Sequence, residues 1–307
     1  MTSQRIKGFH RIVFEWFAKN KRDLPWRRTT DPYAICLSEI MLQQTQVDRV
    51  IPKWTAFLLA FPTWKDLAEA STADVLRLWQ GLGYNRRAVM LHRLAKAVID
   101  LGGELPKDID AMKELPGIGD YTANAIAAFA FKDAKAAPVD TNISRIFRRV
   151  ARPSIADPKS MQRLAKKMAP KDVWTWNHAL MDIGALHCTA RGHLWGFCPL
   201  APLHGSKERD EPWLVKKSLG KFTESDRYFR GRIVDALREN QCSVSALRKM
   251  EPMNTLANDR FSTILDRLIR DGVLEKKNGK VRLVGDDRKT TIYGLDEFLR
   301  RNVSALY

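Results

Sequence analysis

Hydrophobic residues recur at the spacing of amphipathic helices through the first 200 residues of the chain. The segment 47–61 has an apolar residue at every third or fourth position. Asp31 followed by Pro32 favours the start of a helix. N–H groups in the first turn have no partner within the helix, so a proline there loses no hydrogen bond. This region is therefore predicted to be almost entirely helical. Further helices are predicted near 71–80, 86–99, 109–114, 121–131, 142–150, 159–168 and 172–187.

The pattern changes after residue 203, where a polar stretch broken by Gly and Pro is typical of a linker. Helices are then predicted at 226–239, 244–250 and 259–271. Two short strands follow, joined by Asn278 and Gly279, the favoured pair for a type I′ hairpin. Three helices followed by a hairpin is the order of a winged helix. A final helix is expected within 290–307.

Charge narrows the possible partners of this chain. It holds 52 Lys and Arg against 35 Asp and Glu, a formal net charge of +17. The basic residues are spread along the whole sequence, so a disordered basic arm does not explain the excess. A polyanion, most simply nucleic acid, is the expected partner. Because the sequence has no long apolar run and only four Cys, we expect neither a membrane span nor a disulfide scaffold, but a cytoplasmic, nucleoid-associated protein.

A glycine-rich motif, LPGIGDYTANAIAAFAF, covers residues 115–131. Gly117 and Gly119 lie just before a predicted helix, with Leu115 and Ile118 beside them. Glycines at such a position let the backbone turn tightly and point free N–H groups at an anion such as a phosphate. Alone, the motif is a weak signal, because many helices begin near a Gly.

The surrounding motifs are more specific. LPGIGDYTA, followed by VDTNISRIFRR, resembles the helix-hairpin-helix DNA glycosylases of the endonuclease III superfamily. LPWRRTTDPYAICLSEIMLQQTQVDRVIPKW and GLGYNRRAVMLH resemble the adenine DNA glycosylase branch. The resemblance runs from about Asp23 to Leu203. It implies a base excision repair enzyme that flips a base out of the duplex and cuts its glycosidic bond.

The same resemblance implies an all-α fold of two lobes for the core, and the pattern after residue 222 adds a small α+β domain. We expect the glycosylase core to span residues 1–204. Its six-helix lobe is placed at about 29–138, and its second lobe combines 1–28 with 139–204. A linker at 205–222 and a winged-helix domain at 223–307 complete the predicted organisation, and the protein is expected to act as a monomer.

Two carboxyl groups with different tasks are implied for the chemistry. Asp140, in PVDTN, matches the aspartate that stays ionised and stabilises the sugar cation. As an alternative or an additional role, it caps the helix that follows. Glu39, in SEIMLQQT, matches the general acid that protonates N7 of the flipped adenine, a task suited to an apolar pocket. Outside this motif it would be taken for an ordinary exposed helix residue.

Tyr121 occupies the position that holds Lys in bifunctional members of the family. A Lys amine forms a Schiff base with the sugar and then nicks the strand, which Tyr cannot do. We therefore predict a monofunctional enzyme without efficient β-lyase activity. Tyr121 would support the catalytic aspartate, and Asn142 matches a residue that orients the aspartate and the attacking water.

Four further residues are candidates for DNA contact. Gln44 and Tyr84 match residues that enter the duplex near the orphaned base, where a wedge offsets the cost of unstacking. A packed aromatic is the alternative for Tyr84. Trp26 and Arg27 lie in a basic cluster. Arg27 is a candidate for contact with the site or the DNA backbone, and a solvated face is the alternative for the other members.

The family's iron–sulfur pattern is incomplete in this sequence. Adenine glycosylases usually hold a [4Fe–4S] cluster through four Cys with six, two and five residues between them. Cys188 and Cys198 match the first and third ligands, but Trp195 and His204 occupy the other two positions. We predict an enzyme without a cluster or another metal, in which Trp195 fills part of the vacated volume. Zinc on Cys188, Cys198, His204 and His187 or His193 is a weaker alternative.

The leading prediction is a glycosylase that removes adenine opposite guanine or 8-oxoguanine in double-stranded DNA. The alternative substrates are thymine or uracil in G·T or G·U mismatches, and a third possibility is a non-catalytic DNA-binding protein on the same scaffold. The 8-oxoguanine-reading domain of the family has no counterpart pattern here. The predicted winged helix either binds DNA through helix 259–271 and nearby lysines or packs against protein.

Overall fold

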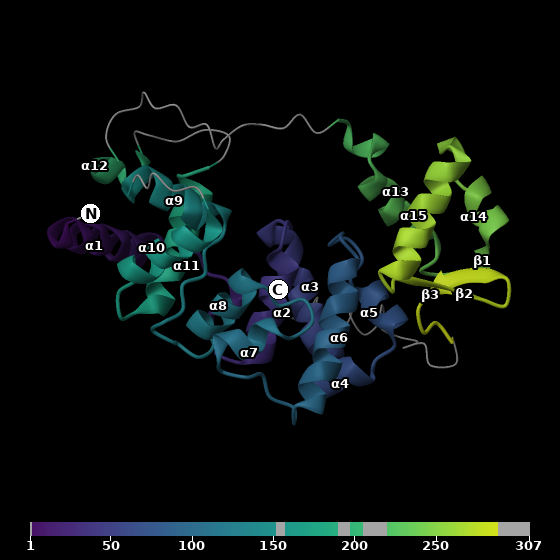
Figure 1. Cartoon of the computed structure of the whole chain (residues 1–307), viewed down its shortest axis with the longest axis horizontal. Coiled ribbons are helices and arrows are strands. Elements are labelled where there is room, and N and C mark those ends of the chain that lie inside the picture. Colours follow the sequence, from purple (N-terminus) through teal and green to yellow (C-terminus); the bar gives the residue numbers. More distant parts are fainter. Residues whose placement is uncertain (1, 152–156, 190–196, 205–219, 288–307) are drawn as a thin grey trace. The chain divides into compact units, whose positions relative to one another are not determined.

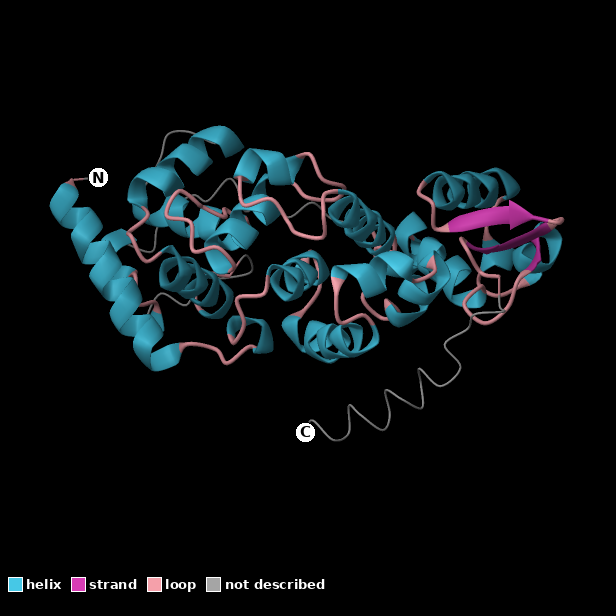
Figure 2. Cartoon of the chain, turned by 90° about the horizontal axis from the view of Figure 1, so that it is seen from below, coloured by secondary structure: helices cyan, strands magenta, loops and turns pink. Residues whose placement is uncertain are grey.

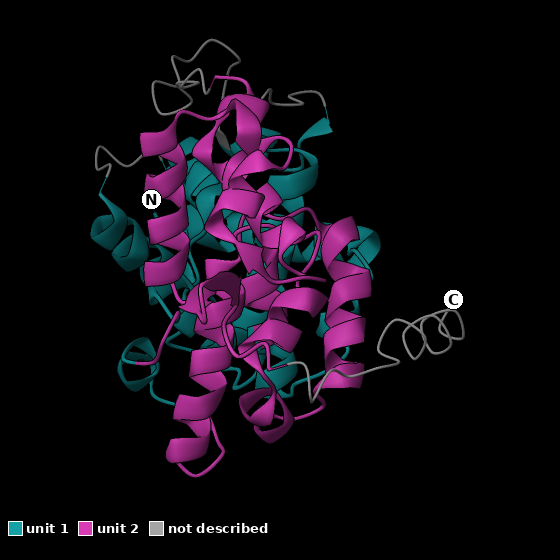
Figure 3. Cartoon of the chain, turned by 90° about the vertical axis from the view of Figure 1, so that its right-hand side faces the viewer, with its two compact units in different colours: residues 1–36, 106–114, 118–217 teal, residues 37–105, 115–117, 218–307 magenta. Residues whose placement is uncertain are grey.

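The computed structural model of the chain describes residues 2–151, 157–189, 197–204 and 220–287. It divides into two compact units, coloured separately in Figure 3. Unit 1 contains residues 1–36, 106–114 and 118–217, and unit 2 contains 37–105, 115–117 and 218–307. The domain boundaries drawn from the sequence stay a prediction beside this division.

Unit 1 is helical in its described part (Figure 1). Thr2 caps its first helix by accepting a hydrogen bond from the Arg5 N–H, and Asp157 and Asp172 cap two later helices in the same way. Its elements are α1 (Ser3–Asn20), η1 (Pro25–Arg27), α7 (Ile109–Lys113), α8 (Asp120–Phe129), α9 (Thr141–Ala151), α10 (Pro158–Met168), α11 (Val173–Leu186) and α12 (Ala201–His204). Helix α2 (Pro32–Leu42) contributes to both units, because the division falls after Cys36.

An aromatic cluster forms the core of unit 1. The Phe9 ring of α1 meets the Trp176 ring of α11 edge to face, with 4.9 Å between centroids. Phe147 of α9 approaches Phe9 in the same manner at 6.4 Å. All three side chains are nearly fully buried. Such pairs add to the free energy gained by burying the apolar surface, so this core fixes α9 and α11 against α1.

The helices of unit 2 begin at the capping residues that the sequence contains. Thr63 and Asp66 form a reciprocal capping box, and Ser71 accepts a hydrogen bond from the Asp74 N–H. Trp79 is fully buried against Phe57, with the rings at 85°. The helices of this part are α3 (Val47–Ala60), α4 (Trp64–Glu69), α5 (Thr72–Leu78) and α6 (Arg86–Asp100).

The C-terminal part of unit 2 combines three helices with a small antiparallel sheet, drawn in magenta in Figure 2. Its elements are η4 (Phe222–Glu224), α13 (Asp226–Ala236), β1 (Cys242–Ser243), α14 (Val244–Lys249), η5 (Met253–Thr255), α15 (Asn258–Arg270), β2 (Leu274–Lys277) and β3 (Lys280–Leu283). Lys277 pairs with Lys280 across a two-residue turn, in which Asn278 and Gly279 both have positive φ. This is the geometry of the predicted type I′ hairpin.

The structure confirms the predicted fold class, an almost entirely helical core followed by a small α+β part. Two details differ from the sequence prediction. Helix α13 ends at Ala236 rather than near residue 239, and strand β1 was not predicted because two residues carry no periodic pattern. Most of the predicted linker and the expected helix within 290–307 lie outside the described residues. Among the described helices, none has the length and apolar character needed to cross a membrane.

Candidate active site

Asp140 lies at the start of α9, where each of its carboxyl oxygens has a donor. Oδ1 accepts from the Ile143 N–H at 2.7 Å, and Oδ2 accepts from the Asn142 side-chain amide at 3.0 Å. The first bond is the predicted helix cap, so Asp140 has this structural role whatever its chemistry. Burial raises the pKa of Asp140, although the two donors and the charge of Arg145 act in the opposite direction. The carboxyl is thus held in one orientation by its neighbours.

Asn142 is itself fixed by Arg145 from the next turn of α9. The Arg145 guanidinium donates to Asn142 Oδ1 and also to the carbonyl oxygen of Cys188. This orients the Asn142 amide so that its nitrogen faces Asp140. On the other side, Gly184 of α11 approaches so closely that a Cβ at this position would lie 2.6 Å from Asn142 Cβ. The glycine therefore permits the contact between α9 and α11 that holds Asn142.

Glu39 lies on α2 and is only 5% exposed. Its neighbours Ser38, Ile40 and Met41 are also buried. The helix is apolar on most of its surface, so burial extends around it rather than along one face. The predicted general acid therefore has the sheltered position that such a role requires.

The glycine-rich turn leads into α8, and its two glycines expose the backbone at the surface. Gly117 has φ +81, and a Cβ there would lie 3.0 Å from Met90 Cβ, so a larger residue would be strained. Gly119 precedes α8 in an extended conformation, and nothing lies within 4 Å of where its Cβ would be. Both glycines are exposed, whereas Ile118 between them is buried and Leu115 partly so. Tyr121 is half-buried in the first turn of the helix.

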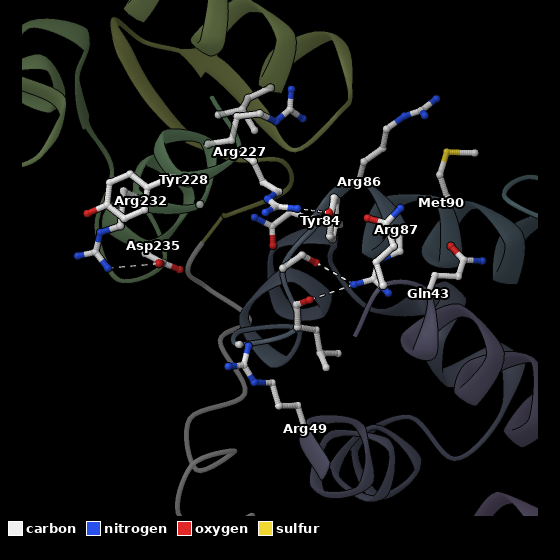
Figure 4. Close-up of a pocket in the computed structure, with 18 of the residues that line it drawn as sticks. Gln43, Arg49, Tyr84, Arg86, Arg87, Met90, Arg227, Tyr228, Arg232 and Asp235 are labelled. Carbon is white, nitrogen blue, oxygen red and sulfur yellow. Dashed lines mark hydrogen bonds and ion pairs between the residues drawn. The ribbon is translucent and has the colours of Figure 1, made fainter. Parts of the chain in front are cut away.

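Gln44 and Tyr84 share an uncommon backbone conformation. Their φ angles are +57 and +47, and few other non-glycine residues of the described chain have positive φ. Both side chains are exposed and line one groove of about 980 Å³ in unit 2 (Figure 4). Left-handed residues cost free energy and tend to occur at functional sites. The Trp79 indole N–H fixes the second turn by donating to the Gly83 carbonyl oxygen at 2.9 Å.

Arg87 links the turn that contains Gln44 to the turn that contains Tyr84, a role that the sequence did not predict. Its guanidinium donates to the carbonyl oxygens of Ile40 and Met41 at 2.8 and 2.9 Å, near the end of α2. It also donates to the Leu82 carbonyl at 3.0 Å, as the dashed lines in Figure 4 show in part. Burial lowers the pKa of Arg87 to about 10. The residue stands in the quoted motif GLGYNRRAVMLH, but no rule of spacing connects it to α2.

Trp26 and Arg27 are buried rather than solvated. Arg27 forms a two-pronged ion pair with Asp182 of α11, both bonds being 2.8 Å, and Arg22 adds one bond from its side chain and one from its backbone N–H. Burial alone would raise the pKa of Asp182, but Arg27 and Arg22 outweigh it and the pKa is lowered. The structure thus gives Arg27 a partner inside unit 1, and its contact with DNA stays a prediction.

Cys188 and Cys198 are both buried in unit 1. The Cys188 sulfur accepts a hydrogen bond from the Arg149 guanidinium at 2.7 Å. Burial raises the pKa of both thiols, that of Cys198 to about 11. With Trp and His at the other two ligand positions, the residues present do not fit a four-thiolate cluster. Trp195 and His193 lie outside the described residues.

Comparison with known proteins places these features in one context. Residues 37–171 match the family described as HhH-GPD superfamily base excision DNA repair protein. An adenine DNA glycosylase of Mycolicibacterium smegmatis is 36% identical over 283 residues, covering 89% of this chain and 95% of that protein. One of Homo sapiens is 38% identical over 226 residues, covering 67% of this chain and 40% of that protein. The solved structure of a thermostable thymine-DNA glycosylase is 30% identical with a TM-score of 0.62, covering 65% of this chain and 95% of that one.

Proposed function

Because this chain belongs to the adenine DNA glycosylase family of helix-hairpin-helix base excision repair proteins, we propose that it removes adenine from mispaired duplex DNA. The preferred pair would be adenine opposite 8-oxoguanine or guanine. The observation that carries the proposal is the fixed carboxyl of Asp140, held by Asn142 and by the N–H of Ile143. An oriented carboxylate is what a developing sugar cation requires.

The reaction is a hydrolysis in which Glu39 and Asp140 have separate roles. Glu39 gives a proton to N7 of the extruded adenine, and the bond between N9 and C1′ breaks with its electron pair going to the base. The Asp140 carboxylate stabilises the cationic sugar that remains. A water molecule adds to C1′ and its proton goes to the Glu39 carboxylate, which restores the acid and leaves free adenine and an abasic site. Asn142 holds Asp140 in position for this step.

Tyr121 supports the proposal that the enzyme is monofunctional. Its phenol has no amine with which to form a Schiff base, so the enzyme would leave the abasic strand intact. Duplexes with A·8-oxoG, A·G, G·T and G·U should be incubated with the protein and analysed with and without alkali. We expect breakage only after alkali, and only for the adenine-containing pairs.

Two substitutions test the roles of the carboxyl groups. Asp140→Asn and Glu39→Gln should each reduce single-turnover excision by at least about 100-fold while duplex binding stays close to wild type. Asn can still cap α9, so the first change should leave the fold intact. Excision at the wild-type rate by both variants would refute the mechanism.

A thymine or uracil glycosylase is the second candidate, supported by the likeness to the thymine-DNA glycosylase structure. Pyrimidines have no N7, so Glu39 would have to act on a different atom of the base or take no part in its departure. Excision from G·T that is unaffected by Glu39→Gln would favour this candidate over the first.

We also propose that the fold is maintained without an iron–sulfur cluster. The proposal is supported by the two non-cysteine ligand positions and by the hydrogen bond that occupies the Cys188 sulfur. Iron, acid-labile sulfide and zinc should be measured per mole of freshly purified protein, and Cys198→Ser should retain activity. A stoichiometric amount of iron or zinc would overturn this proposal.

A further inference from the structure

The C-terminal part of unit 2 is anchored to α5 through buried polar groups. Arg77 of α5 pairs with Asp286, whose side chain is 1% exposed, at 2.7 Å. The same guanidinium donates to the Arg238 carbonyl oxygen at 3.0 Å, and the buried Arg238 side chain returns a bond to the Leu76 carbonyl oxygen. Strand β3 also contacts α5. Buried, mutually satisfied charges of this kind allow little freedom of orientation.

Contacts at the other end of this interface involve α6. Asp271, after α15, pairs with Arg230 of α13 and lies 3.6 Å from Arg86 of α6. Gly272 lies against Arg93 and Val89, where a Cβ would be 2.7 Å from the Arg93 guanidinium. The C-terminal part is therefore packed against α5 at one end and against α6 at the other. This gives α13 a defined position beside the turn that contains Tyr84.

Helix α13 forms one side of the groove that contains Gln44 and Tyr84. Arg227 of α13 donates to the Tyr84 hydroxyl, as Figure 4 shows. Its guanidinium also lies over the Tyr84 ring at 5.4 Å and over the exposed Phe222 ring at 4.9 Å. An arginine in contact with two aromatic rings is a surface suited to nucleic acid, because it offers both charge and flat faces.

The charged side chains that line this groove are mostly positive. Four exposed arginines line it: Arg49, Arg86, Arg227 and Arg232. Its lining has one carboxylate, Asp235, which pairs with Arg238 and Arg232. Within the described residues, Arg49 and Arg227 have no acidic partner. A polyanion is the complementary occupant.

In α15, the helix that would read DNA in an ordinary winged helix, two of the three arginines are paired within the C-terminal part. Arg260 of α15 donates to Asp226 at 2.9 Å, and Arg267 lies 3.6 Å from the same carboxylate. These pairs lie between α15 and α13, inside the C-terminal part. The arginines of α13, in contrast, face the groove.

We propose that α13, through Arg227 and Arg232, binds the phosphates of duplex DNA beside the orphaned base, and that Arg227 holds Tyr84 in position there. This inference rests on the proposed function for its substrate. It assigns DNA binding in the C-terminal part to α13 rather than to α15. The C-terminal part thus completes the groove from which Tyr84 acts.

The test compares two double variants of the full chain that remove the same charge. Arg227→Ala with Arg232→Ala changes the groove, and Arg267→Ala with Arg270→Ala changes the exposed side of α15. The dissociation constant should be measured at several salt concentrations, using a duplex with uncleavable 2′-fluoro-deoxyadenosine opposite 8-oxoguanine. Thermal unfolding checks that each variant is folded.

The α13 variant should bind roughly tenfold or more weakly, with a salt slope smaller by about 2, because two phosphate contacts are lost. The α15 variant should bind within about twofold of wild type. Arg227→Ala alone should also slow single-turnover excision at saturating enzyme, because Tyr84 loses its partner.

Equal binding by the α13 variant and wild type, or an equal loss in the α15 variant, overturns the inference. These outcomes are separable from failure of the proposed function. If wild-type protein excises no base but the α13 variant still binds the duplex more weakly, the proposed function fails and the α13 site stands. If wild type excises adenine and the α13 variant binds normally, the proposed function stands and the α13 site fails.

Discussion

Gly184→Ala should impair excision through a single methyl group. The new Cβ would lie 2.6 Å from Asn142 Cβ, 3.3 Å from its Cγ and 3.4 Å from its Cα. Carbon atoms pack at about 3.5–4.0 Å, so the first turn of α9 and α11 must separate by roughly 0.9 Å. The atom in closest contact is the Asn142 Cβ, which is fixed to the backbone, so a side-chain rotation does not relieve the clash.

The displacement falls on the hydrogen bond between Asn142 and Asp140, which is 3.0 Å long. The clash is at the Asn142 side chain itself, and a shift of its amide relative to Asp140 by most of an ångström takes this bond beyond the roughly 3.5 Å at which it stops stabilising the carboxylate. We expect single-turnover excision to fall about 100-fold, the usual scale for a misplacement of 1 Å. Overpacking should also reduce the free energy of unfolding by roughly 1–3 kcal/mol.

Gly8→Ala is the matched control in the same unit. Gly8 lies inside α1, and nothing lies within 4 Å of where its Cβ would be. That change should stabilise the helix by up to about 1 kcal/mol and leave excision unaltered. Excision should be followed with enzyme in excess over an A·8-oxoG duplex. A wild-type rate in folded Gly184→Ala would refute the role of Asn142 in orienting Asp140.

Three further predictions follow from the same contacts. Arg27→Ala leaves the buried Asp182 with only Arg22, so urea denaturation should show a loss of roughly 3 kcal/mol, and a loss under about 0.5 would contradict this. Because burial raises the pKa of Asp140 and its ionised form is the active one, the acid limb of the excision profile should fall as pH drops through that raised pKa. The single-turnover pH profile should therefore have an acid midpoint above the roughly 3.9 of an exposed aspartate, and a midpoint at or below that value would refute the assignment. Arg87→Met removes the clamp between the turns of Gln44 and Tyr84, so duplex affinity should fall about tenfold or more in fluorescence titration, and unchanged affinity would refute it.

Local signals in the sequence were sufficient for most of the fold. Asn278 and Gly279 specify their turn by themselves, because both accept positive φ. The place of Asp140 before α9 predicted its role as a cap, whereas its catalytic role was implied only by the resemblance of its motif to the family. The helices follow from apolar spacing and capping residues, which act within a few residues of each other.

Contacts between distant parts of the chain could not be predicted in this way. The partner of Arg87 is the end of α2, and that of Arg77 is Asp286, more than 200 positions away. A buried charge such as Asp182 has the same local pattern as an exposed one. The association of α13 with Tyr84 depends on such pairs, so only the folded chain reveals it.

Direct detection of the released base tests the central claim most simply. A duplex with A·8-oxoG should be incubated with wild-type protein and with Asp140→Asn, and the products analysed by mass spectrometry before any alkali treatment. The account predicts one free adenine per duplex and an unbroken strand with wild type, and almost no free base with the variant. Release of thymine or uracil from G·T or G·U instead, or a strand broken without alkali, would contradict it.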